Sequence, residues 1–162
     1  MLPRAIAIVR ILIGIAVLAM GVIRLMDPTF LYGGLMLELA GHGQPYAFYQ
    51  RYVLGRYVLM NQELFAYGLG IGEILVGLSF LTGALVSLGA LGGAFLVLNF
   101  GFAVSAGKPL LMALHVLLAL VFLALGRYGA GLTWGVDGWL ARRINEVIIL
   151  FPLRLSLPDY FK

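Results

Sequence analysis

The sequence contains no cysteine and few charged residues. Its 162 residues include 11 Lys and Arg, 7 Asp and Glu, and 2 His. Without thiols, the chain has no disulfides, thiol redox chemistry, Fe–S cluster or thiolate metal site of its own. A soluble domain would carry about twice the 11% charged fraction found here. The basic residues are dispersed along the chain, which gives no indication of nucleic-acid binding.

Hydrophobic residues make up 62% of the chain, and its mean hydropathy is +1.03. A chain of this length cannot bury so much apolar surface within itself, so the composition predicts an integral membrane protein. We therefore expect an all-α membrane protein whose main partner is the lipid bilayer. The length suits one compact bundle and no second globular domain.

Long apolar runs indicate where the chain crosses the membrane. About 20 apolar residues are needed for a helix to cross a ~30 Å hydrocarbon core. We predict a four-transmembrane-helix bundle over residues 1–126, with spans at about 5–24, 64–82, 84–104 and 109–126. A cleaved signal peptide is the alternative for the first run. It is disfavoured because Arg10 divides the apolar core and no clear cleavage site follows.

Two segments outside the spans are more polar. The outer loop, residues 27–62, contains Tyr46–Met60, where aromatic and basic residues alternate. This mixture predicts an amphipathic interfacial helix in the headgroup zone. Residues 127–162 are expected to form an interfacial tail on the other side. Six basic residues fall on the side of the termini and four on the opposite side, so we expect both termini in the cytoplasm of a multi-pass cell-membrane protein.

Glu73 is a carboxylate in the middle of the second predicted span. An ionisable side chain at that depth costs roughly 2.5–3.5 kcal/mol on insertion scales, so it indicates a partner or a function. Its neighbours at i−3 and i+4 are Gly70 and Gly77. Because glycines let another helix approach closely, we expect Glu73 to point into the bundle.

Two arginines share one face of the first predicted span. Arg10 and Arg24 lie at helical spacing with Gly14 and Gly21. Arg10 either snorkels to the cytoplasmic surface or pairs with Glu73. At 1.5 Å per residue, the two residues are offset by about 7 Å along the membrane normal. Arg24 lies farther toward the outer end and would need a shifted helix to reach Glu73.

Asn99 and His115 are polar residues of the third and fourth spans. One interpretation is that each makes an interhelical hydrogen bond, worth about 0.6 kcal/mol. The other is that they line a cavity with Glu73 that accepts a quinone-like headgroup, with Glu73 and His115 exchanging protons. A haem is disfavoured because the other histidine, His42, lies in the outer loop. A metal site is also disfavoured, since one His and one Glu fall short of three ligands.

Several blocks of the sequence resemble the DoxX family of small four-helix membrane proteins. They are Phe65-Ala66-x4-Gly70-x2-Glu73-Ile-Leu-Val-Gly77-Leu, the Thr82-Gly83 turn, Gly126-Arg127, Gly135-x-Asp137-Gly-Trp-Leu140 and Arg142-Arg143, preceded by Arg10, Gly14, Gly21 and Arg24. This family is related to a subunit of thiosulfate:quinone oxidoreductase. The resemblance implies a membrane component linked to quinones or to redox complexes.

The leading hypothesis is a membrane subunit of a quinone-linked oxidoreductase with a soluble or membrane redox partner. Its pocket would use Glu73 and His115 for proton exchange and Arg10, Asn99 and Arg24 for ligand binding. The alternative is a non-enzymatic scaffold that recruits a soluble partner through Asp137, Arg142 and Arg143. A third hypothesis, ranked last, is a proton or small-solute carrier that uses Glu73 as a relay.

Overall fold

Four long helices dominate the computed structural model, which describes residues 2–143 and 150–153. They are α1 (Leu2–Met26), α4 (Gln62–Thr82), α5 (Val86–Val104) and α6 (Pro109–Arg127). Each is long and apolar enough to cross a membrane. The prediction of an all-helical, multi-pass membrane protein is therefore confirmed for these residues, and the four helices lie where the sequence predicts the four spans. Arg154 and Lys162, two of the basic residues used to predict orientation, lie outside the described residues.

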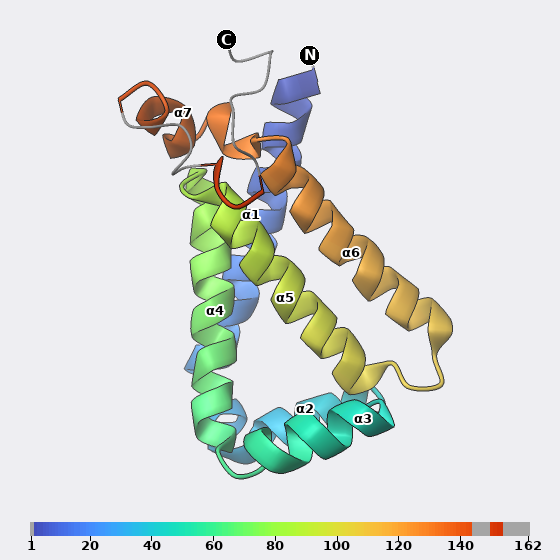
Figure 1. Ribbon diagram of the computed structural model, residues 1–162. Coiled ribbons are helices and arrows are strands. Elements are labelled where there is room, and N and C mark those ends of the chain that lie inside the picture. Colours follow the sequence, from blue (N-terminus) through green and yellow to red (C-terminus); the bar gives the residue numbers. More distant parts are fainter. Residues whose placement is uncertain (1, 144–149, 154–162) are drawn as a thin grey trace.

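Short helices cover the two ends of the long ones (Figure 1). One end, called here the α2 end, is crossed by η1 (Phe30–Gly34), α2 (Leu35–His42), α3 (Ala47–Tyr49) and η2 (Gln50–Val58). The other, the α7 end, holds η3 (Ala130–Leu132), α7 (Val136–Leu140) and the start of α1. Helix α1 packs along α4, and α5 packs along α6. The long helices thus form two antiparallel hairpins, joined mainly where α4 meets α5.

Glycines set the register between α1 and α4. A Cβ atom on Gly14 would lie 2.5 Å from the backbone nitrogen of Leu81, and one on Gly77 would lie 2.5 Å from that of Leu18. No real side chain tolerates such distances, so the two backbones meet only because these positions lack Cβ. Continuing this antiparallel register places Glu73 level with Val22.

A pair of phenylalanine rings joins the two hairpins. Phe80 of α4 and Phe122 of α6 are both fully buried, with ring centroids 5.1 Å apart in an edge-to-face arrangement. Phe122 also fills the space left by Gly93 on α5, where a Cβ would lie 2.5 Å from its Cδ1. Such aromatic pairs contribute about 0.5–1.5 kcal/mol beyond their buried area. This contact holds α6 to the rest of the structure near the α7 end.

Asp137 caps the start of α5 at the α7 end. Its carboxylate accepts hydrogen bonds from the backbone N–H groups of Leu85 (2.7 Å) and Val86 (3.0 Å), while its own N–H donates to Gly83 O (2.8 Å). Gly83 and Leu85 both have positive φ, +70° and +52°, so α5 begins at Val86 and not at residue 84 as predicted. Burial raises the pKa of Asp137, and the two N–H donors and nearby Arg10 oppose that shift.

Arg10 is fully buried at the same end of the molecule. Its guanidinium donates to the backbone oxygens of Ala130 (3.0 Å) and Trp134 (3.1 Å), in the segment that follows α6. Arg10 therefore neither snorkels to a surface nor reaches Glu73, and both expectations are wrong. It fastens the first turns of α1 to the chain around η3. In the same region, the interfacial tail predicted over 127–162 is described only at 127–143 and 150–153.

The glycine register gives a direct test of the fold. Gly77→Ala should destabilise the protein by about 1–3 kcal/mol, because the added methyl group forces α1 away from α4. Gly68→Ala on the same helix is the matched control, since nothing lies within 4 Å of its Cβ position. It should be neutral or stabilising by up to about 1 kcal/mol, because alanine favours helix. Thermal unfolding in a mild detergent measures both. Equal effects of the two substitutions would contradict the proposed close contact.

Candidate functional site

Arg24 joins three helices through two ion pairs. It lies in the last turn of α1, where Nη1 contacts Glu73 Oε1 of α4 and Nη2 lies 2.5 Å from Glu38 Oε1 of α2. The side chains of Arg24 and Glu73 are 12% and 9% exposed. The guanidinium also lies over the rings of Phe30 and Phe100, at 5.6 and 6.0 Å from their centroids. We call Arg24, Glu38 and Glu73 the ion cluster.

The partner of Glu73 is therefore Arg24, and the predicted Arg10–Glu73 pair is wrong. Aligning the ends of the predicted spans brought Arg10 close to the level of Glu73. The glycine register shifts α1 by about two turns relative to that alignment. Arg10 then lies twelve residues from the level of Glu73, about 18 Å along the helix at 1.5 Å per residue. Arg24 lies two residues from that level and meets Glu73 directly.

Glu38 and His42 are members of the site that the sequence prediction missed. Both belong to α2, which falls within the segment predicted as an outer loop. A signal was present, because Leu35, Glu38, Leu39 and His42 repeat at the spacing of one helix face. The polar residues within this short apolar helix could therefore have been assigned to a face packed on the bundle.

One oxygen of Glu73 has no hydrogen-bond partner among the described residues. Arg24 contacts Oε1, whereas Oε2 is buried and unpaired. A buried carboxylate oxygen left without a donor is costly, since burial removes the water that would otherwise bind it. The cluster also holds one positive charge against two negative charges. Its excess charge and its free oxygen both favour a hydrogen-bond donor at this position.

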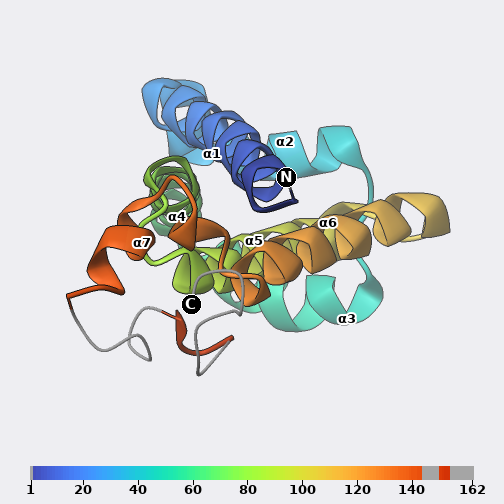
Figure 2. The same cartoon turned by 90° about the horizontal axis from the view of Figure 1, so that it is seen from above.

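Glu73 lines a cavity of about 460 Å³ between the two hairpins. Residues of all four long helices form its walls, and α2 covers one end. In Figure 2, α1 and α6 diverge from the α7 end, with α2 between their far ends. Met20 of α1 and Leu118 of α6 line the cavity and are 49% and 42% exposed on the side of the protein. The remaining lining residues are mostly apolar: Ile13, Ala16, Val17, Leu69, Gly93, Leu96, Val97, Phe100 and Phe122, with Arg24, Glu38, His42 and His115 as polar members.

His115 of α6 lines the same cavity and lies beside Phe100. Its ring centroid is 5.8 Å from that of Phe100, whose other neighbour is His42 at 5.4 Å. The Nδ1 atom of His115 lies 2.7 Å from Leu111 O. A carbonyl oxygen only accepts, so Nδ1 carries the proton of this hydrogen bond. Glu73 and His115 thus share one cavity, as the prediction for these two residues requires.

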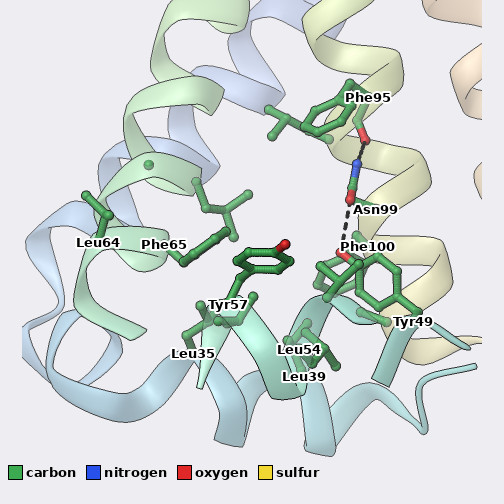
Figure 3. Close-up of a pocket in the computed structure, with 16 residues that line it drawn as sticks. Leu35, Leu39, Tyr49, Leu54, Tyr57, Leu64, Phe65, Phe95, Asn99 and Phe100 are labelled. Atoms are coloured by element: carbon green, nitrogen blue, oxygen red, sulfur yellow. Dashed lines mark hydrogen bonds between the residues drawn. The ribbon is translucent and has the colours of Figure 1, made fainter. Parts of the chain in front are cut away.

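Asn99 does not share that cavity. Its Nδ2 donates to Phe95 O (2.8 Å), and its Oδ1 accepts from the hydroxyl of Tyr49 (3.0 Å). Both residues line a second cavity of about 560 Å³ between α4, α5 and the helices of the α2 end, with the ring of Tyr57 across its middle (Figure 3). Burial raises the pKa of Tyr49, which keeps its hydroxyl a donor. The expectation that Asn99 joins Glu73 is therefore wrong.

The second cavity is less suited to chemistry than the first. Two of its polar residues, Asn99 and Tyr49, bind each other, the third is Tyr57, and its other lining residues are mainly leucine, phenylalanine and valine. The first cavity holds the ion cluster and an unpaired carboxylate oxygen, so we take it as the candidate site. Within residues 2–143 and 150–153, no three His, Cys, Asp or Glu side chains come close enough to hold a metal ion.

The three residues of the scaffold hypothesis, Asp137, Arg142 and Arg143, lie at the α7 end. Asp137 is occupied in capping α5, which gives it a role in the fold. Arg143 lies over the exposed ring of Trp139, 4.9 Å from its centroid. Under the scaffold hypothesis, Arg142 and Arg143 are exposed and accessible to a partner, whereas Asp137 is buried.

Comparison with known proteins gives no relative: the chain matches no family model, no curated protein and no solved structure.

The ion cluster predicts that removing its cation alone destabilises the protein more than removing all three of its charges together. Arg24→Gln leaves the buried carboxylate of Glu73 and the partly exposed carboxylate of Glu38 without a cation, and should destabilise the protein by about 3–5 kcal/mol. Combining it with Glu38→Gln and Glu73→Gln removes the excess charge and should recover a large part of that loss. Thermal unfolding in detergent measures both variants. Arg51→Gln, at an exposed position of η2, is the control and should change stability by less than about 0.5 kcal/mol. Failure of the triple variant to exceed the single variant in stability would contradict the cluster.

Proposed function

We propose that the protein is a membrane subunit of a quinone-linked oxidoreductase, and that the cavity beside the ion cluster binds the ring of a quinone or quinol. The observation that carries the proposal is that Glu73 lines this cavity while its buried Oε2 has no hydrogen-bond partner among the described residues. A ligand hydroxyl would satisfy this oxygen. The resemblance of α4 to the helix of DoxX proteins that carries the glutamate supports the same assignment.

The size and walls of the cavity suit an apolar ring. Ligand pockets of about 300–1,000 Å³ with mostly apolar walls and few polar groups are typical of small-molecule sites. This cavity has a volume of about 460 Å³ and contains Phe100 and Phe122 among its apolar residues. Phe100 offers an aromatic face between two histidines. An aromatic headgroup would pack there with its oxygens directed to the polar residues.

The arrangement of the protein in the bilayer explains how such a ligand enters. We place the four long helices across the membrane and the α3–η2 segment at its interface, where its exposed Arg51, Tyr52 and Arg56 lie among headgroups. From the distribution of basic residues we propose that the α7 end faces the cytoplasm. A cavity bordered by the exposed side chains of Met20 and Leu118 then opens toward the acyl chains. Lipid-soluble quinones reach it without passing through water.

Glu73 and His115 supply the proton chemistry of this proposal. Conversion of a quinol to a quinone releases two protons and two electrons. A carboxylate and a neutral imidazole are suitable bases for the protons. We assign the electrons to a partner subunit that carries the redox centre. Glu38, which is partly exposed at the α2 end, extends the polar cluster from Glu73 toward the surface.

The proposal predicts saturable binding of a short-chain benzoquinone or its quinol to the purified full-length chain. Isothermal titration calorimetry in detergent micelles measures it, with protein-free micelles as the background. Glu73→Gln should weaken binding of the quinol about tenfold, because a hydrogen bond to a charged acceptor is stronger than one to an amide. Absence of saturable binding, or equal binding by Glu73→Gln, would show that the cavity has a different use.

A second variant tests the location of the site. Ala16→Trp places a large ring at an exposed position of α1 that lines the cavity, and it should abolish binding. Ala19→Trp, one turn away and also exposed, is not part of the lining and serves as the matched control. Unchanged affinity in Ala16→Trp, or the same loss in both variants, would place the ligand elsewhere.

A further inference from the structure

Two of the polar side chains that line the cavity, Glu73 and His115, hold an atom that accepts hydrogen bonds. Arg24 is directed to carboxylates through both terminal nitrogens, Nη1 to Glu73 and Nη2 to Glu38. Glu73 lines the cavity, and its buried Oε2 has no partner among the described residues. An ionised carboxylate accepts hydrogen bonds and donates none. The unpartnered oxygen of Glu73 is therefore an acceptor.

The tautomer of His115 adds a second acceptor. Because Nδ1 donates its proton to Leu111 O, the neutral ring carries no proton on Nε2. His115 and Glu73 come from α6 and α4, on different walls of the same cavity. A ligand between them therefore faces acceptors from two directions.

The charge of the ion cluster also favours a ligand that donates hydrogen bonds. One guanidinium faces two carboxylates, so the surroundings of the ligand carry one excess negative charge. That charge attracts the positive end of an O–H dipole and repels a carbonyl oxygen. In a cavity with few polar groups the effect is stronger than in water, because the local dielectric constant is low.

We propose that this cavity selects the reduced, two-hydroxyl form of a quinone over the oxidised dione. The inference rests on the proposed function and specifies which redox form occupies the site. A quinol offers two O–H donors, one for Glu73 Oε2 and one for His115 Nε2. The dione offers only acceptors to the same two atoms, which leaves them unpaired. Sites built to bind a substrate hydroxyl reject analogues that lack it for this reason.

Selective binding of the quinol also changes the redox properties of the bound couple. Tighter binding of the reduced form raises the midpoint potential of the couple in the site. For a two-electron couple, each tenfold preference corresponds to about 30 mV. The bound quinol is therefore a weaker reductant than the free one, and the site holds it until a partner with a sufficiently high potential accepts its electrons.

The test compares three ligands on the full-length protein in detergent micelles: a short-chain benzoquinol, the matching dione, and the quinol with both hydroxyls methylated. The quinol is measured under anaerobic conditions. We expect it to bind at least about tenfold more tightly than either of the others, because only it donates two hydrogen bonds. Equal affinities, or tighter binding of the dione, overturn the selectivity while leaving the proposed binding site intact. No binding of any of the three overturns the proposed function as well.

Substitution at His115 tests the second acceptor separately. His115→Phe keeps an aromatic ring beside Phe100 and removes the nitrogen, so it should reduce the preference for quinol over dione several-fold. Asn99→Leu is the matched control, because Asn99 lies in the neighbouring cavity that shares Phe100 as a wall. It should leave the preference unchanged. An unchanged preference in His115→Phe, or an equal change in Asn99→Leu, overturns the assigned role of His115.

Discussion

The close contact between α1 and α4 is the constraint on which the rest of the structure depends. Gly14 and Gly77 allow the two backbones to meet, and this contact determines which residues of the helices lie at the same level. Arg24 then lies beside Glu73, and Arg10 lies far from it. A register shifted by two turns would separate Glu73 from Arg24. The position of the ion pair thus follows from backbone packing.

The two ends of the molecule use buried charge differently. At the α7 end, Arg10 donates to backbone oxygens, and Asp137 accepts from the backbone at the start of α5. Both residues complete hydrogen bonds that the turns would otherwise leave unmade. At the α2 end, the ion cluster has an excess negative charge and Glu73 keeps an unpaired oxygen. Arg10 Nε at the α7 end is also buried without a partner. What distinguishes Glu73 is that it lines a cavity together with the rest of the ion cluster.

The sequence was sufficient to predict the helical class and the positions of the four long helices. A run of about 20 apolar residues is the length that a helix needs to cross a membrane. It also indicated that Glu73 is buried against glycines. It could not give the register of α1 on α4, which depends on which glycine meets which backbone, so the pairing with Arg10 was wrong. Asn99 was misplaced because its depth was known but its direction around α5 was not. Glu38 and His42 were missed because α2 was treated as a loop.

The central claim is that the Glu73 carboxylate, held by Arg24, accepts a hydrogen bond from a ligand in the cavity. Difference infrared spectroscopy of the protein with and without bound quinol observes that carboxylate directly. The account predicts a ligand-induced shift of a carboxylate stretching band that is present in the native protein and absent in Glu73→Gln. The same difference bands in both proteins would contradict it.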